Sequence, residues 1–162
     1  CCDLRAVMNE FAARDLDFEA HIRVSFGRQS FMQHIGAELT HVMPGRVEMQ
    51  LPWQEFLGQQ HGYFHGSVIG TIVDNACGYA AFSLAAAEDS VLTVEYKLNL
   101  VAPGKGEALI ARGEVVKPGR TLTVCEARIY AVNRGKEKLS VIALETLTLL
   151  PDTPDSLERH RD

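Results

Sequence analysis

Residues 59–76 read QQHGYFHGSVIGTIVDNA, and this stretch says more about the fold than any other part of the chain. A polar loop that carries glycines leads directly into a segment that is apolar on nearly every side. Such a segment predicts a buried helix, which we expect at residues 66–87. The helix carries one acid in its middle, Asp74. Because an ionised carboxylate among apolar side chains is costly unless it is paired or used, Asp74 is either a structural acid or a functional one.

The rest of the chain predicts strands around that helix. Alternating apolar and polar residues indicate two strands before it, at 35–42 and 46–51, and four after it, at 91–102, 107–116, 121–132 and 139–150. In the strand at 91–102, Leu92, Val94, Tyr96, Leu98 and Leu100 form an apolar face that is expected to cover the helix. The polar face, which includes Thr93, is expected to look toward solvent or a second subunit.

Helical spacing also predicts segments at 4–14 and 17–32, upstream of the first strand. The whole order favours an α+β fold in which an antiparallel sheet of five to six strands wraps around one long central helix. We expect an N-terminal helical extension at 1–33, one domain at 34–150 and a flexible tail at 151–162.

Composition excludes several classes of protein. The chain has 162 residues and a net charge of −5, which argues against nucleic acid as a partner. No apolar run reaches the ~20 residues of a membrane span. Four cysteines without a CxxC pair or secreted spacing favour reduced thiols in a cytoplasmic protein. His61 and His65 are four residues apart, but no third ligand stands out, so we expect no metal.

These residues resemble those of hotdog-fold acyl-CoA thioesterases, in particular the branch that includes PaaI-like enzymes and one type of 4-hydroxybenzoyl-CoA thioesterase. The resemblance extends over about residues 30–150. It is carried by Gln59, the pair His65-Gly66, Asp74 nine positions after His65, the strand TVEYKLNLVAP at 93–103 and the turn KPGRT at 117–121.

The resemblance implies a role for each matching residue. Asp74 matches the catalytic carboxylate, and Gly66 matches the residue whose amide N–H binds the thioester oxygen. Gln59 matches a residue near the thioester, His65 one that supports the loop, and Thr93 one that holds water near the carboxylate. Gln59 and Thr93 also fit plain polar surface.

The chemistry suits these residue types. Thioester hydrolysis builds negative charge on a carbonyl oxygen, and an N–H at a helix N-terminus stabilises that charge. Since a thiolate leaves easily, one carboxylate suffices, either as general base on water or as nucleophile. However, Gly66 and Asp74 are about 12 Å apart along a helix, too far to act on one carbonyl. In hotdog dimers one subunit's helix start faces the other's acid, so the resemblance implies a homodimer or a dimer of dimers.

Coenzyme A is expected as part of the substrate, with no separate cofactor. Lys117 and Arg120 flank a tight turn in an otherwise acidic chain, and with Gly119 and Thr121 they are candidates to bind its phosphates. The alternative is that these cations are simply solvated.

Two other functions stay open beside hydrolysis of acyl-CoA. One is a hydratase or dehydratase of the same fold, although its Gly-Asp-x-Asn-Pro-x-x-His and His-Phe-Pro-Gly motifs are absent from the sequence. The other is a non-catalytic module that binds acyl-CoA for regulation. Tyr63, Phe64, Phe82 and Trp53 indicate an apolar pocket for an aromatic or medium-chain acyl group.

Overall fold

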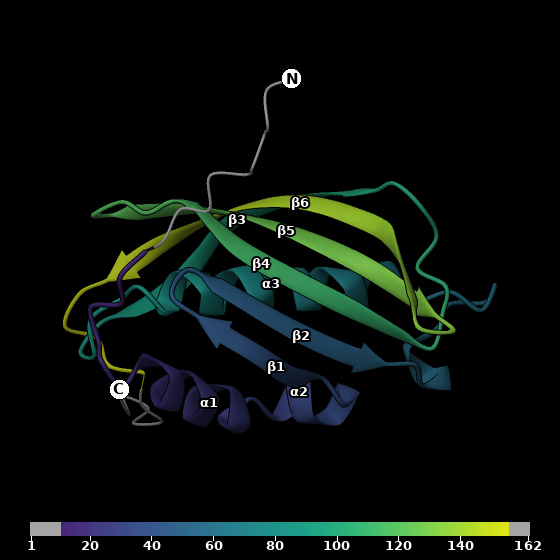
Figure 1. The fold of residues 1–162 in the computed structure, drawn as a ribbon, viewed down its shortest axis with the longest axis horizontal. Helices are drawn as coiled ribbons and strands as arrows, with labels where there is room; N and C mark the ends of the chain where they lie inside the picture. The colour runs from purple at the N-terminus through teal and green to yellow at the C-terminus, as the bar shows by residue number, and fades with distance from the viewer. Residues whose placement is uncertain (1–10, 156–162) are drawn as a thin grey trace, which may run out of the picture.

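The computed structural model of the protein describes residues 11–155. Six antiparallel strands form one sheet in the order β1-β2-β4-β5-β6-β3, and the sheet curls around helix α3, Gly66–Phe82 (Figure 1). The strands are β1 Glu38–Met43, β2 Arg46–Pro52, β3 Ser90–Leu100, β4 Ala108–Lys117, β5 Leu122–Asn133 and β6 Lys136–Leu150. The expected α+β fold, a sheet wrapped around one long helix, is therefore confirmed.

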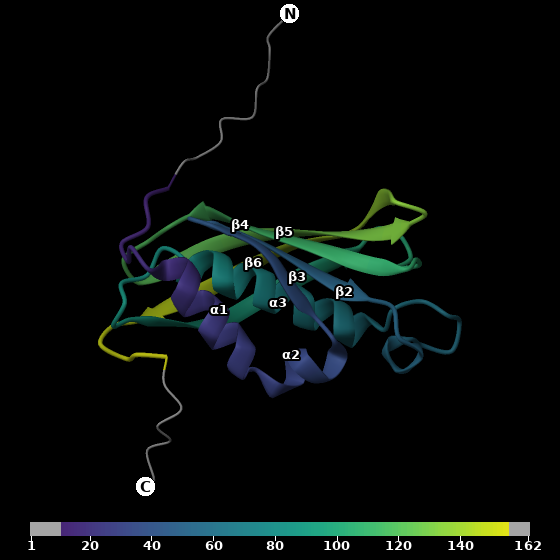
Figure 2. The same ribbon diagram turned by 60° about the horizontal axis from the view of Figure 1, so that its bottom comes forward.

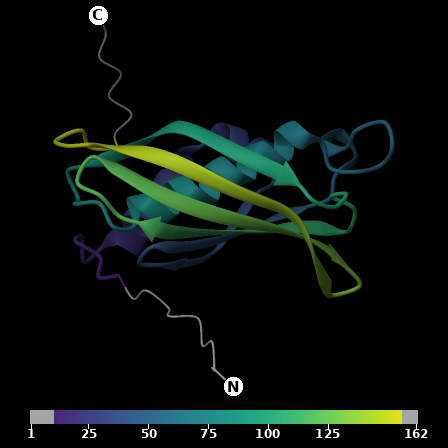
Figure 3. The same cartoon turned by 90° about the horizontal axis from the view of Figure 1, so that it is seen from above.

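Helix α3 lies in the core because its side chains are small and apolar. Val73, Ala76, Cys77 and Ala80 are completely buried against the concave face of the sheet. Contact with β4 is closest at Gly113, where a Cβ atom would lie 2.4 Å from the backbone carbonyl of Ala76. A side chain at position 113 would push the sheet away from the helix. Seen from above, the strands cross α3 obliquely (Figure 3).

Helix α3 ends at Phe82, so our prediction that it continues to residue 87 is wrong. The side chain of Ser83 is buried, donates to the Ala80 carbonyl at 2.7 Å and accepts from the Gly45 amide at 2.7 Å. The next amides bond three residues back, as Leu84 does to Ala81. A tertiary contact to the β1–β2 turn therefore ends a helix that local propensity would have extended.

The structure divides the single helix predicted at 17–32 into two. The structure has α1 at Phe18–Arg28 and α2 at Ser30–Ile35, separated at Gln29, whose side chain donates to the Tyr79 hydroxyl at 2.8 Å. Because α2 occupies residues up to Ile35, β1 begins three residues later than expected. Both helices lie on the same side of the sheet as α3 (Figure 2).

The prediction of a helix at 4–14 is wrong for residues 11–14, the part of this range that the structure describes. Residues 4–10 lie outside the described residues, and residues 11–14 form no helix. Phe11 instead packs beside the turn between β1 and β2, where a Cβ atom on Gly45 would lie 2.6 Å from its ring. This side-chain contact outweighs the local helical spacing.

Strand β3 forms an edge of the sheet, and a bulge at Val94 changes which side chains face the helix. Thr93 pairs with Leu147 and Glu95 pairs with Thr146, so Val94 is the extra residue. Before the bulge Thr93 faces inward; after it Tyr96 does. The expectation that Thr93 looks away from the helix is therefore wrong. Leu92 and Val94, expected to face inward, are 58% and 55% exposed.

None of the helices in residues 11–155 combines the length and apolar character that a membrane span requires.

Candidate active site

His65 lies immediately before the first residue of α3. This residue caps the helix: its Nδ1 accepts from the Ser67 amide at 3.1 Å and lies 2.6 Å from the Ser67 hydroxyl. Its own amide donates to the Leu57 carbonyl at 2.8 Å, which fixes the preceding loop. Gly66 is exposed, and apart from its chain neighbours and the backbone of its own helix no atom lies within 4 Å of the place where its Cβ would be. Within the described residues nothing accepts from the Gly66 amide, as expected for a helix first turn.

Gln59 belongs to the same loop. Its amide donates to the Tyr63 carbonyl at 2.8 Å, and its side-chain oxygen accepts from the His61 amide. The side-chain NH₂ of Gln59 forms no hydrogen bond within the part of the chain that the structure describes. The structure therefore gathers Gln59, His65 and Gly66 at one end of α3, with two kinds of N–H group available to an acceptor.

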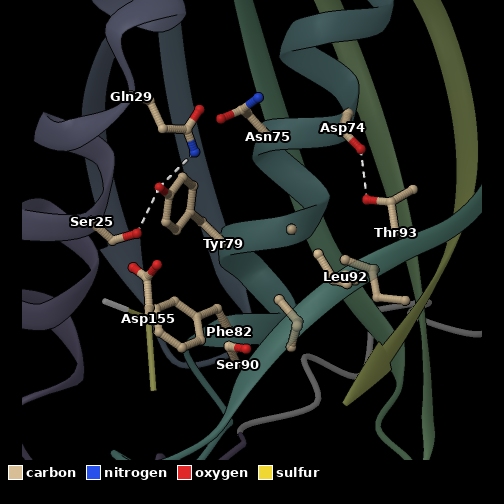
Figure 4. Close-up of a pocket in the computed structure, with 13 residues that line it drawn as sticks. Ser25, Gln29, Asp74, Asn75, Tyr79, Phe82, Ser90, Leu92, Thr93 and Asp155 are labelled. Atoms are coloured by element: carbon tan, nitrogen blue, oxygen red, sulfur yellow. Dashed lines mark hydrogen bonds between the residues drawn. The ribbon is translucent and has the colours of Figure 1, made fainter. Parts of the chain in front are cut away.

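Asp74 lies about two turns further along α3, on the wall of a cavity. Its Oδ1 accepts a hydrogen bond of 2.7 Å from the Thr93 hydroxyl (Figure 4). The bulge at Val94 turns Thr93 toward the helix, so the strand positions the hydroxyl and the helix positions the carboxylate. The structure brings these two residues together, whereas the Gly66 group is at a different place on the helix.

Glu145 is a second carboxyl at this site and was missed by the sequence analysis. It lies on β6, is 0% exposed, and its Oε1 is 3.0 Å from the Thr93 hydroxyl. Burial, followed by the nearby charge of Asp74, raises the pKa of Glu145 to about 8. A signal was present: Val141, Ala143 and Leu147 are its neighbours on the apolar face, so an acid stands in an apolar position of the alternation.

The cavity beside Asp74 has a volume of about 270 Å³. Val91, Leu147 and Phe82 give it apolar walls, and α1 closes one side. On that side the Tyr79 hydroxyl bonds to Ser25 at 3.0 Å and to Gln29 at 2.8 Å (Figure 4). The cavity thus has apolar walls and several polar side chains, which include Asn75, Ser90 and Asp155 besides Asp74 and Thr93.

Only one of the four expected pocket aromatics, Phe82, lines this cavity. Trp53 and Phe64 pack edge to face in the loop before α3, with ring centroids 4.8 Å apart. Tyr63 lies in that loop as well, beneath the ammonium group of Lys105 at 5.7 Å. Those three aromatics hold the loop that precedes Gly66.

The turn at 117–121 joins β4 and β5, and all of its residues are exposed. Leu122, next to the turn, pairs with Thr148, which on its other side pairs with Leu92 near the start of β3. Phe64, next to the start of α3, bonds instead to Gly104, beyond the end of β3. Lys117, Gly119, Arg120 and Thr121 therefore lie at the opposite end of the sheet from Gly66, and one chain does not bring them together.

No group of three or more candidate ligands that could hold a metal ion occurs among residues 11–155. One chain thus has an unpartnered amide at the start of α3 and, about two turns further along, a positioned carboxylate beside a cavity. That combination suits attack on a carbonyl group whose oxygen takes up charge.

Residues 61–138 match the family model described as "Thioesterase superfamily". The chain is 46% identical to a thioesterase family protein from Silicibacter pomeroyi, whose crystal structure aligns with a TM-score of 0.81 over 83% of this chain and 98% of that one. The PaaI protein of E. coli shares the fold, with a TM-score of 0.77 at 15% identity over 88% and 99% of the two chains. A 1,4-dihydroxy-2-naphthoyl-CoA hydrolase from Listeria monocytogenes is 27% identical over 95 residues, covering 59% of this chain and 77% of the relative.

Proposed function

Because the chain belongs to the thioesterase superfamily and is thus a thioester hydrolase, we propose that its substrates are acyl-CoA thioesters, which it converts to the free acid and coenzyme A. One observation carries this proposal: Thr93 holds the Asp74 carboxylate on the wall of a cavity that has room for an acyl group. The relative from Listeria named as a CoA hydrolase supports the choice of coenzyme A as the carrier.

Asp74 either attacks the thioester carbon itself or activates the water molecule that attacks it. The Thr93 hydroxyl fixes Oδ1, which leaves Oδ2 for the reaction. As a general base, Oδ2 takes a proton from water while the water oxygen adds to the thioester carbon. As a nucleophile, Oδ2 forms a mixed anhydride that water then hydrolyses. In both routes coenzyme A leaves as a thiolate, which then takes up a proton to become the thiol.

The Gly66 amide is the group that stabilises the developing oxyanion. It is exposed at a helix N-terminus, where the dipole of the helix adds to its own N–H. Since Gly66 and Asp74 of one chain are about 12 Å apart, the amide that serves Asp74 comes from a second copy.

Strand β3 is the surface through which we expect the second copy to bind. It is an edge strand of 11 residues, and Leu92, Val94 and Tyr96 expose 58%, 55% and 45% of their surface. Such an edge offers unpaired backbone groups to another strand. Because Thr93 lies on β3 and contacts Asp74, pairing along β3 brings the partner subunit next to the carboxylate. A homodimer, or a pair of such dimers, follows.

Two further regions select the substrate. The cavity of about 270 Å³ is sized for an aromatic or medium-chain acyl group. The exposed cations Lys117 and Arg120, with Gly119 and Thr121, are suited to the phosphates of coenzyme A.

Release of free thiol from a panel of acyl-CoAs tests this function. Steady release with an aromatic or medium-chain acyl-CoA supports the thioesterase. A change at an enoyl double bond without thiol release would identify a hydratase or dehydratase. Tight binding of acyl-CoA without turnover would identify a non-catalytic module.

A further inference from the structure

Glu145 is buried beside the site, and the mechanism above gives it no task. Asp74 and Cys77 face it from α3, Cys125 pairs with it from β5 and Tyr96 pairs with it from β3. No salt bridge of the described residues includes Glu145, and its Oε2 has no hydrogen-bond partner there. A charge on this carboxyl would therefore have no compensating cation.

The hydrogen bonds around Thr93 cannot be satisfied by Thr93 alone. Its hydroxyl oxygen lies 2.7 Å from Asp74 Oδ1 and 3.0 Å from Glu145 Oε1. A hydroxyl group has one hydrogen to donate, so only one of these two contacts receives it. The other contact needs a hydrogen supplied by a carboxyl group.

Of the two carboxyl groups, Glu145 is the one less able to ionise. Asp74 lines the cavity and is partly exposed, whereas Glu145 is 0% exposed. Ionisation costs more at the buried position. The same burial, with the Asp74 charge beside it, raises the pKa of Glu145 to about 8.

We propose that Glu145 is a neutral carboxylic acid that donates its proton from Oε1 to Thr93 Oγ1, and thereby directs the Thr93 hydrogen to Asp74. Glu145 is a positioning residue in this scheme, because it acts through Thr93. Two hydrogens then serve the two contacts of Thr93 Oγ1, one with each carboxyl group. Its consequence for catalysis rests on the thioesterase activity proposed above.

Loss of the Glu145 proton would undo this arrangement. The single hydrogen of Thr93 would be shared between two carboxylates, and a second negative charge would stand next to Asp74. Oδ1 would no longer be held in one orientation. The enzyme is therefore expected to lose activity as the pH rises through about 8.

Two substitutions separate this role from simple packing. In Glu145→Gln the amide can donate to Thr93 at any pH, so kcat should stay within about threefold of wild type, with no alkaline loss near pH 8. In Glu145→Met the donor is gone, so kcat should fall about tenfold with KM unchanged. Glu88→Gln, the same change at an exposed position, should leave the pH profile as it is. An alkaline limb in Glu145→Gln like that of wild type, or equal kcat in the Gln and Met variants, would overturn the proposal.

A measurement without substrate decides the protonation state separately. An infrared difference spectrum of wild type minus Glu145→Gln near neutral pH should contain the carbonyl band of a neutral carboxylic acid, and Asp74→Asn should retain it. Absence of that band overturns the proposal even in an active enzyme. If no acyl-CoA is hydrolysed but the band is present, the protonation stands and the proposed function fails.

Discussion

The hydroxyl oxygen of Thr93 lies 2.7 Å from a carboxylate oxygen of Asp74, and the bulge at Val94 makes this contact possible. Without the bulge, Thr93 would lie on the outer face of the sheet with Leu92 and Val94 turned inward. The strand therefore departs from regular pairing at the place where it must hold a side chain against the helix.

Asp74→Asn tests the carboxylate. The amide keeps the shape and still accepts from Thr93, but it is a poor base and a poor nucleophile. We expect kcat to fall by about three orders of magnitude or more, with folding retained. Thiol release measures the rate, and circular dichroism checks the fold. Asp17→Asn, an exposed acid whose side chain does not cap α1, is the matched control and should be fully active. Activity of Asp74→Asn within tenfold of wild type would exclude the role.

Mixed dimers test the shared site. Gly66→Pro removes the amide N–H at a first helical position, which proline tolerates well. Asp74→Asn and Gly66→Pro chains should each be inactive alone. A heterodimer of the two contains one intact site, so a random equal mixture should recover about a quarter of wild-type activity.

Two results would count against a site shared between subunits. One is a mixture that stays inactive although light scattering shows that heterodimers form. The other is a wild-type monomer with full activity.

Arg120→Ala tests the turn at 117–121. Loss of a contact to phosphate weakens ground state and transition state alike, so KM for acyl-CoA should rise several-fold while kcat changes little. The dependence of KM on salt should weaken as well. An N-acetylcysteamine thioester, which lacks the nucleotide, should be unaffected. Arg128→Ala removes an equal charge from the exposed face of the sheet and serves as the control. Equal damage with both substrates would mean that Arg120 supports the fold.

Glu145 also makes stability depend on pH. Its pKa is raised to about 8 in the folded protein, from an ordinary value of 4.5. The folded chain thus holds the proton more tightly, and this contribution to stability is complete below about 4.5 and lost as the pH rises through about 8.

Glu145→Gln lacks this loss. The free energy of unfolding of the variant, relative to that of wild type, should therefore rise by up to about 1.4 kcal/mol per pH unit as the pH increases from about 4.5 to about 8. Urea unfolding at several pH values measures the difference. Glu88→Gln should give a difference that does not vary with pH, and the same flat result for Glu145→Gln would contradict the shifted pKa.

The sequence contains most of the fold but few of its irregularities. All six strands lie within about three residues of their predicted ends, because alternation along a sheet with one buried face is a strong signal. Our prediction for the end of α3 was wrong because residues 83–87 favour a helix by local propensity. The structure ends the helix where Ser83 bonds to the Gly45 amide. The bulge at Val94 has no counterpart in the pattern, because the apolar residues from Leu92 to Leu100 continue the alternation unbroken.

The candidate site shows the same division. Asp74 and Gly66 stand out in the sequence, as an acid in an apolar helix and a glycine at its start. The direct contact of Thr93 with Asp74 contradicts the strand pattern, and the family resemblance implied only that Thr93 holds water near the carboxylate. Glu145 was visible as an acid among apolar neighbours, but its distance to Thr93 depends on the pairing of β6 with β3. The roles of these residues in catalysis remain predictions.

Helix α1, with Gln29 just after it, closes one side of the cavity through the hydrogen bonds of Ser25 and Gln29 to Tyr79. It contributes none of the groups assigned to bond breaking. In the proposed function, α1 therefore helps to shape the acyl site, whereas the reacting groups come from α3 and β3. Exchanging α1 between relatives is therefore expected to alter which acyl group fits while leaving the proposed reacting groups in place.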